Sequence, residues 1–423
     1  MMVLDSLRAD FLELCNSQGE HLPHAFRALR SLTSPCRHST CGSIGSLPMR
    51  TDLLTGRLAF LDERWAGPTS ADSVWTQLVS AKGVHTTLVT DNYVLFLPDK
   101  HLGFHTFFDD CHFIRGAGSD RHALTKPRWR STGRTAQAKM LEEQSIANLE
   151  GWRTSGSAPH ARLFEAAENT LRNEVRNGRD FLLWVDSFSP HEPWIEPEDL
   201  EADLPSVPIL PESGLATSYL PQELEELKRR YARRIATLDF SMASFVAALA
   251  PLVRAGDVGL ALISDHGYLF GEYGLVGKPK DHPPTPPLYD VVTWTSPHFS
   301  SLYDSPEGVQ PHTLGRILAA AVANLGDYHP TSMPACPGWH VVGRNGPTVH
   351  HLALVAEKQQ AVLFRDDAYE PIRWYDRSQL DARIPWSDQP YRSSKSPNCD
   401  WAGLLPNRPW IANFQKSLNP VLN

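Results

Sequence analysis

The sequence predicts an α/β protein: a mostly parallel central sheet with helices on both faces, followed by a smaller C-terminal α+β subdomain. Two near-continuous apolar runs, FLLWVDSF at 181–188 and VGLALISDHG at 258–267, are typical of strands buried in a parallel sheet. Segments with helical spacing precede both runs, and such strand–helix–strand alternation indicates parallel pairing. Beyond about residue 330 apolar and polar residues alternate, as in antiparallel strands. We therefore expect a large domain over 1–330 and a smaller subdomain over 331–423.

The N-terminal part of the large domain begins with a candidate strand, MVL at 2–4, and helical spacing follows after Asp5. The segment DSVWTQLVSAK at 72–82 predicts a helix capped by its first or second residue. It leads into the candidate strand GVHTTLVTD at 83–91. The next segment, 114–158, is rich in Arg, Gly and Ser, which indicates an irregular excursion.

Two further helices complete the large domain. Helical spacing near 161–177 leads into the strand at 181–188, and a Pro-rich loop follows. The clearest helix covers 221–255: it begins with Pro and acidic residues and stops at Gly256.

Composition and charge argue against several classes of protein. The 423 residues carry a formal net charge of −8 and no basic run, which argues against a nucleic-acid partner. The N-terminal segment lacks the features of a signal peptide, and no stretch approaches the roughly 20 apolar residues of a membrane helix. We therefore expect a cytoplasmic protein with no membrane contact. The six cysteines form no CxxC pair, so mostly reduced thiols are expected.

Polar residues follow three of the predicted strands. Asp5 comes after MVL, His191 after FLLWVDSF, and Asp265 and His266 after LALIS. Ligands of parallel α/β sheets bind beyond the carboxyl ends of the strands. Aspartates together with a histidine are the donors of a metal site, although a single Asp at a strand end is often only a helix cap.

The segment SLPMRTDLLTGR at 46–57 has two interpretations. A serine at a helix start has free backbone N–H groups and the positive end of the helix dipole, so Ser46 suits attack on an anionic ester, with Arg50 supplying further donors. Alternatively, the segment is a surface turn with a cap at Thr51 or Asp52 and a solvated Arg50. Spacing alone favours the second interpretation.

The same segment resembles the sulfatase signature, in which Cys or Ser is followed by x-Pro-x-Arg and later by Thr-Gly-Arg. Three other segments resemble elements of this family in the expected order: LDSLRADFL at 4–12, SPHEPW at 189–194 and SDHGYLFGEYGLVGK at 264–278. The resemblance covers residues 3–278 and implies the fold of the alkaline phosphatase superfamily.

The resemblance also implies a metal and a set of reacting groups. Asp5, Asp265 and His266 would bind a divalent cation, most often Ca²⁺ in sulfatases, with Mn²⁺ or Zn²⁺ as alternatives. Ser46 would be the nucleophile, oxidised to formylglycine by a modifying enzyme in Ser-type sulfatases. The other implied groups are Arg50, which would stabilise the nucleophile and the oxyanion, and His191 and Lys278, which would contact the anion.

The chain departs from the family pattern at two places. Ser6 stands where a second Asp is usual, which removes one charge from the metal site. Asp91 and Tyr93 stand where a Lys and a His are usual, which removes two cationic donors from the anion pocket. Three histidines are further candidates for the pocket border: His101, His105 and His282.

Three functions remain open from the sequence. The first is a metal-dependent sulfatase acting on a small anionic ester. The second is a phosphodiesterase, phosphonate hydrolase or phosphotransferase that uses unmodified Ser46, which the missing Lys and His favour. The third is a non-catalytic binding protein of the same fold.

Overall fold

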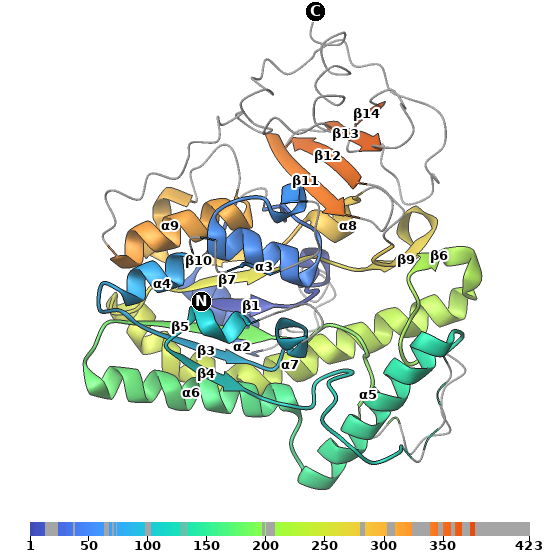
Figure 1. Cartoon of the computed structure of the whole chain (residues 1–423), viewed down its shortest axis with the longest axis horizontal. Coiled ribbons are helices and arrows are strands. Elements are labelled where there is room, and N and C mark those ends of the chain that lie inside the picture. The colour runs from blue at the N-terminus through green and yellow to red at the C-terminus, as the bar shows by residue number, and fades with distance from the viewer. Residues whose placement is uncertain are drawn as a thin grey trace, which may run out of the picture.

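A seven-stranded sheet in the order β2-β10-β7-β1-β5-β3-β4 forms the centre of the molecule (Figure 1). Its strands are β1 (Met2–Leu4), β2 (Ser34–Pro35), β3 (His85–Thr90), β4 (Asp110–Phe113), β5 (Phe181–Ser187), β7 (Ala261–Ser264) and β10 (Thr293–Thr295). The computed structural model describes residues 1–12, 24–36, 39–62, 67–69, 72, 74–97, 103–127, 129, 131, 133–196, 199, 208–279, 284–302, 309–323, 339–345, 350–356, 360–365 and 373–376.

The five strands from β7 to β4 run parallel, and β10 and β2 add an antiparallel edge. In the centre of the sheet, Met2 of β1 lies opposite Val185 of β5 on one side and Leu262 of β7 on the other. All three of these strands are buried apart from the first residue of β5, which explains their continuous apolar composition. The predicted parallel sheet is confirmed.

Helices cover both faces of the sheet, as predicted (Figure 1). One face packs against α2 (His24–Leu32), α6 (Pro159–Asn177) and α7 (Pro221–Ala255). The other face packs against α3 (Ser46–Thr55), α4 (Trp75–Ser80) and α9 (Pro311–Ala323). Two hydrophobic cores therefore flank the sheet and hold its strand ends in fixed positions.

Helix α7 has the bounds that the sequence predicts, and helix α4 is shorter than predicted. The N-cap of α4 is Val74, because the Asp72 side chain instead accepts from the Thr69 backbone and pairs with Arg57. Within the described residues α7 is also apolar enough, by length and composition, to cross a membrane. Its buried side chains belong to the core beneath the sheet, and a core helix of this kind meets the same criteria.

The prediction of an irregular excursion over 114–158 was wrong, because residues 136–155 form helix α5 (Ala136–Ser155). Thr135 caps its start by accepting from the Ala138 amide, and Gly156 ends it in a left-handed conformation. Its buried face includes the polar residues Glu142 and Asn148. Polar side chains on the packed face hide the usual apolar periodicity, so only the two caps mark this helix in the sequence.

Smaller elements complete the description. A three-stranded sheet in the order β6-β9-β8 is formed by β6 (Gly214–Leu215), β8 (Leu269–Phe270) and β9 (Leu275–Gly277), and a short helix, α8 (Pro286–Tyr289), follows. Beyond α9 the described residues form an antiparallel sheet of β11 (Trp339–Asn345), β12 (His350–Ala356), β13 (Gln360–Arg365) and β14 (Arg373–Asp376). This agrees with the predicted antiparallel pattern, while the boundary near residue 330 falls outside the described residues. The cysteines that the structure describes, Cys36, Cys41 and Cys111, are free thiols.

Candidate active site

Three neighbouring strands bring carboxylates to one edge of the sheet. Asp5 follows β1, Asp186 is the penultimate residue of β5, and Asp265 follows β7. These strands are adjacent in the order β7-β1-β5, and the carboxyl ends of parallel strands meet at the same edge. All three aspartates are fully buried.

Asp5, Asp265 and His266 form a buried cluster in which one ligand atom of each residue lies within 4.8 Å of the others. The Nδ1 atom of His266 donates to the Gly267 carbonyl oxygen at 2.9 Å, which leaves the Nε2 lone pair on the side of the carboxylates. Burial lowers the pKa of His266 to about 3, so the ring is neutral and able to coordinate a metal. Such a group of donors fits a divalent cation.

The charges of the two clustered carboxylates are strongly coupled. Burial and the charge of Asp5 raise the pKa of Asp265 to about 7. The pKa of Asp5 is lowered, because the positive charges around it, Arg50 among them, outweigh the opposing effect of burial. The two acids repel each other, and the nearby Arg50 leaves the pKa of Asp265 raised, so a bound dication would stabilise both in the ionised form.

Arg50 is fully buried and binds three carboxylates. Its Nε and Nη2 atoms form a two-point contact with Asp186 at 2.7 and 2.8 Å, and Nη1 contacts Asp265 at 2.8 Å. Nη1 also donates to the Ser46 carbonyl oxygen at 2.9 Å, and Nη2 lies 3.3 Å from Asp5. In this geometry the guanidinium orients the carboxylates. It also joins the start of α3 to the candidate metal-ligand cluster of Asp5, Asp265 and His266, called the metal-ligand cluster below.

Asp186 and Asn92 are site residues that the sequence analysis did not identify. The Asn92 side-chain amide donates to Asp5 at 3.0 Å and lies 3.4 Å from Asp186. Both residues are fully buried. A lone acid inside the apolar run FLLWVDSF was a usable signal for Asp186, because a buried charge requires a partner. Asn92 had no comparable signal.

Ser46 is the first residue of α3, and the residue before it, Gly45, has a φ of 128°. The loop before the helix is held by the buried Asp52, which accepts from the Ser43 amide, the Ser43 hydroxyl and the Ala59 amide. Ser46 is therefore at a fixed helix start, where backbone N–H groups and the helix dipole favour an anion. The alternative that Asp52 caps this helix is wrong, because Asp52 lies within it.

The Thr-Gly-Arg end of the motif is structural. The Thr55 hydroxyl donates to the Thr51 carbonyl oxygen, and Gly56 ends α3 with a left-handed φ of 69°. Arg57 pairs with Asp72 near the surface. The segment therefore fixes the length of the helix that carries Ser46.

Ser6 links the metal-ligand cluster to the surrounding residues. It has a positive φ of 63°, and its amide donates to Asp265 at 2.7 Å while its hydroxyl donates to Asp5 at 2.9 Å. The hydroxyl of Tyr231, on α7, donates to the Ser6 carbonyl oxygen at 2.7 Å and holds this strained conformation. A neutral hydroxyl thus stands where an acid is usual.

His191 and Lys278 lie side by side beyond Ser6. The Nζ atom of Lys278 is 2.8 Å from His191 Nε2 and 3.5 Å from the Ser6 hydroxyl. It also contacts the carboxylate of Glu192 at 3.1 Å. The structure therefore brings both residues expected to contact the anion to the border of the metal-ligand cluster. Glu192 is a third member of this group that the sequence analysis did not single out.

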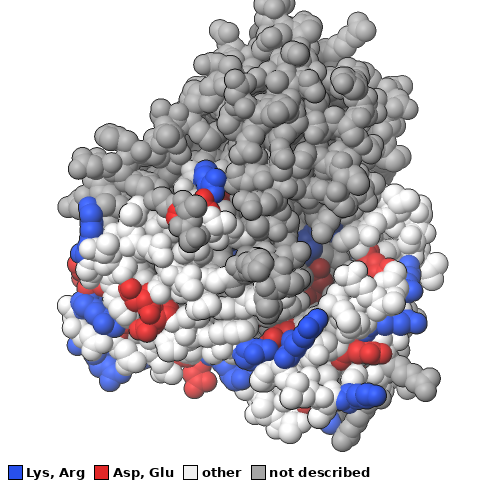
Figure 2. Space-filling view, viewed as in Figure 1, with Lys and Arg blue, Asp and Glu red and all other residues white. Residues whose placement is uncertain are grey.

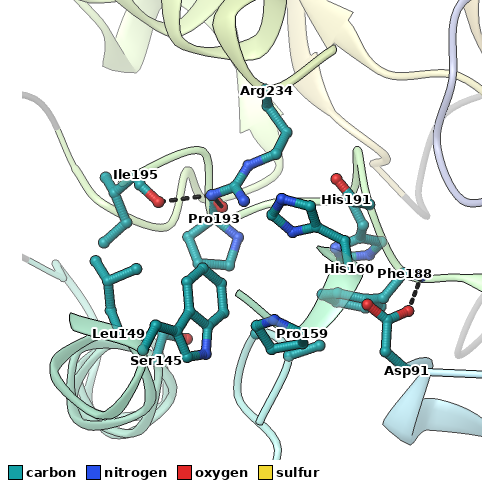
Figure 3. A pocket seen from close by; sticks show the side chains of 14 residues that line it. Asp91, Ser145, Leu149, Pro159, His160, Phe188, His191, Pro193, Ile195 and Arg234 are labelled. Carbon is teal, nitrogen blue, oxygen red and sulfur yellow. Dashed lines mark hydrogen bonds between the residues drawn. The ribbon is translucent and has the colours of Figure 1, made fainter. Parts of the chain in front are cut away.

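Asp91 and Tyr93, which stand where cationic side chains are usual, both contact Phe188, and the Tyr93 ring lies 5.3 Å from the Phe188 ring. Asp91 accepts from the Phe188 amide at 2.6 Å, and burial raises its pKa to about 7. Asp91 and His191 both line a small cavity of about 20 Å³ (Figure 3). That volume holds about one water molecule. Of the other expected border residues, His105 stacks on Phe96, whereas His101 and His282 lie outside the described residues.

A family model for sulfatases matches residues 1–320, a stretch that includes all of these site residues. The chain belongs to the sulfatase family. None of the curated proteins matches it.

Solved structures support the same fold for this sulfatase-family chain. A phosphonate monoester hydrolase of Agrobacterium radiobacter has a TM-score of 0.59 and 13% sequence identity, with 90% of each chain covered. A 2-O GAG sulfatase has a TM-score of 0.57 and 10% identity, with 89% of this chain and 84% of that chain covered. A protein whose structure was solved in complex with its substrate, D-glucosamine-2-N,6-O-disulfate, has a TM-score of 0.53 and 10% identity. The match covers 89% of this chain and 91% of that chain. At these identities the similarity concerns the fold alone.

Proposed function

We propose that this protein is a metal-dependent hydrolase that cleaves a sulfate ester, with Ser46 as the nucleophile, either unmodified or as formylglycine. One observation carries the proposal. Arg50 Nη1 contacts both the Ser46 carbonyl oxygen and the Asp265 carboxylate, so the helix start that carries the hydroxyl is tied to a buried metal-ligand cluster. Membership in the sulfatase family supports hydrolysis of this class of ester.

The donors favour a transition metal. Asp5, Asp265 and the neutral imidazole of His266 would hold the cation, which would polarise an ester oxygen when bound. Ca²⁺ prefers oxygen donors alone, whereas Mn²⁺ and Zn²⁺ accept a nitrogen ligand. We therefore place Mn²⁺ or Zn²⁺ ahead of the Ca²⁺ that the family resemblance implies.

The chain's own residues divide the remaining tasks. Ser46 would attack the ester from the start of α3, and Arg50 would act as a positioning residue through the carboxylates that it holds. Lys278 and His191, which face each other at 2.8 Å, would bind the non-bridging oxygens or protonate the leaving oxygen.

A second candidate is a phosphonate or phosphodiester hydrolase that uses unmodified Ser46. The specific observation in its favour is the scarcity of cations around the anion: the buried acid Asp91 replaces a cationic donor, and Lys278 is paired with Glu192. Both candidates take an ester with a single negative charge.

Replacement of Ser46 by Ala tests the proposal. Turnover of an aryl sulfate, a bis-aryl phosphate and an aryl phosphonate would be measured for wild type, for Ser46→Ala and for the exposed control Ser31→Ala. We expect Ser46→Ala to lose at least about a thousandfold in turnover of the active substrate, with an unchanged Tm. Intact mass separates the two nucleophiles, because formylglycine lacks two hydrogen atoms relative to serine. No turnover of any ester by the metal-supplemented wild type would instead support a non-catalytic binding protein.

A further inference from the structure

Glu192 forms a close ion pair with the lysine that borders the metal-ligand cluster. Both carboxylate oxygens lie 3.1 Å from Lys278 Nζ, and the two side chains are only 11% and 14% exposed. Because the pair is largely removed from water, solvent screens it weakly. Burial of Glu192 opposes its ionisation, but the charges of His191 and Lys278 outweigh that effect and lower its pKa. Glu192 therefore carries a full negative charge beside the anion position.

Lys278 reaches the metal-ligand cluster from this pair. Its Nζ atom lies 3.5 Å from the Ser6 hydroxyl, which in turn contacts Asp5 at 2.9 Å. Its Nζ atom lies over the Tyr268 ring, 5.4 Å from the ring centre. These contacts fix the ammonium between Glu192 and the cluster, so a bound anion would share the lysine with a carboxylate.

With a dication bound, the positive groups of the site do not outnumber the negative ones. The negative groups are the carboxylates of Asp5, Asp186, Asp265 and Glu192, and the positive groups are Arg50, Lys278 and the dication. The buried acid Asp91, which lines the same cavity as His191, can only add to the negative side. The loaded site thus has no formal excess of positive charge with which to neutralise a second charge on the substrate.

We propose that Glu192 is a specificity residue that makes this site select esters with one negative charge over esters with two. This inference rests on the proposed function, because it concerns the anion bound at the same site. It predicts that sulfate monoesters, phosphodiesters and phosphonate monoesters are accepted, whereas phosphate monoesters, which are dianions above neutral pH, are rejected.

Glu192 acts through charge rather than through the orientation of its histidine neighbour. His191 Nδ1 lies 2.8 Å from the backbone carbonyl oxygen of Glu192, a contact that any side chain at this position preserves. The side-chain carboxylate of Glu192 lies farther from His191 Nδ1, at 3.2 Å. Glu192→Gln keeps the size of the side chain and one carbonyl oxygen for Lys278, so it removes the charge with little change in shape.

The test uses two tetrahedral oxyanions of similar size and different charge, sulfate and perchlorate. Their dissociation constants would be measured by calorimetry at pH 8, with the full chain saturated with the divalent cation that most raises its Tm. In wild type we expect the dissociation constants of sulfate and perchlorate to be similar. In Glu192→Gln we expect the ratio of affinities to shift toward sulfate by about tenfold, the order of magnitude for one unscreened charge at this distance.

Two further variants give the test its controls. Glu225→Gln removes the same charge from an exposed position on α7 and should leave the ratio unchanged. Lys278→Met should shift the ratio toward perchlorate, which provides a second test with the opposite sign if Glu192→Gln folds poorly. An unchanged ratio in folded Glu192→Gln, or in Lys278→Met if Glu192→Gln does not fold, would overturn the inference and leave the proposed hydrolase intact. Absence of binding of either anion to the wild type would contradict the proposed function itself.

Discussion

Single side chains decide whether buried charge is tolerated in this molecule. Arg50 has no exposed surface, and its five N–H groups face Asp5, Asp186, Asp265 and the carbonyl oxygen of Ser46. A planar guanidinium can donate two hydrogen bonds to one carboxylate and a further hydrogen bond to another at the same time. A lysine ammonium lacks this fixed planar arrangement of donors. Arg50 is therefore the residue on which the geometry of the cluster depends most.

Removal of the Arg50 charge should destabilise the protein. Arg50→Met leaves three buried carboxylates facing one another, and we expect it to lower the free energy of unfolding by about 3 kcal/mol or more. Denaturant unfolding of the metal-free protein measures the change.

The matched control is Arg172→Met. Arg172 forms an exposed pair with Glu168 on α6, which contributes about 0.5 kcal/mol at most. Equal losses of stability in the two variants would show that the Arg50 network is not a major stabilising feature.

His160 should make the fold sensitive to acid. Burial and the charge of Arg234 lower its pKa to about 3. Below the unfolded value of about 6.5 the unfolded chain binds a proton that the folded chain does not, so stability falls as pH falls, by up to about 1.4 kcal/mol per pH unit from this residue. Above that pH the residue is neutral in both states and has no effect.

The measurement compares the free energy of unfolding at pH 7 and pH 5. His160→Gln should lose about 2 kcal/mol less than wild type over this interval. His105→Gln, at an exposed position, should keep the wild-type difference. The same pH difference in all three proteins would contradict the assignment.

Among the elements, α3 contributes most to the geometry of the candidate site, because it carries both Ser46 and Arg50. It packs against α9 at Gly315, where an added Cβ would lie 1.9 Å from the Leu53 carbonyl oxygen. Its first residue is set by Gly45 and its last turn by Gly56. Close approach of α9 thus fixes the helix that carries Ser46 and Arg50.

Two Gly→Ala substitutions within helices should have opposite effects. Gly315→Ala places a methyl group against the backbone of α3, and we expect it to destabilise the fold by about 2 kcal/mol or more. Gly151→Ala, in α5, adds a methyl group with no atom within 4 Å, so it should stabilise by about 0.5–1 kcal/mol through helix propensity. Thermal and denaturant unfolding measure both. Stabilisation by Gly315→Ala would contradict the close contact between α3 and α9.

At the scale of the whole molecule, the sheet joins ligands that are distant in the chain. Asp5 and Asp265 meet because β1 lies between β5 and β7, with helices filling both faces. On the face shown in Figure 2 the acidic and basic side chains of the described residues are interspersed. The carboxylates of the candidate site, in contrast, are buried at the strand ends.

A cation that joins two strands should stabilise the entire domain. Mn²⁺ or Zn²⁺ at about one hundred times its dissociation constant should raise the free energy of unfolding by about 2.7 kcal/mol, which thermal unfolding detects as a higher Tm. Ca²⁺ at the same concentration should give a smaller increase in Tm, and a chelator should reverse the increase caused by each cation.

Two histidine variants complete this experiment. His266→Gln replaces the nitrogen ligand and should abolish the preference for Mn²⁺ or Zn²⁺ over Ca²⁺. His112→Gln, at an exposed position on β4, should behave as wild type. A Tm that does not respond to any divalent cation would contradict the metal site.

The sequence predicted the parts of this site that are local in the chain. Apolar runs marked β5 and β7, and the polar residues after β1 and β7 pointed to Asp5, Asp265 and His266. Helix α5 was missed because hydrogen bonds inside the fold satisfy its buried polar residues, such as Glu142 and Asn148. Such partners lie far away in the sequence and leave no periodic pattern.

By itself the sequence determined the strands and helices with apolar patterns, the motifs and the residue types available for chemistry, because these depend on neighbours within a few residues. Only the tertiary structure decided which charges meet: that Asp186 and Asn92 join the cluster, and that Glu192 is paired with Lys278. The physical reason is that electrostatic energy in a buried site depends on distances across strands and loops, and pairing within a sheet sets those distances.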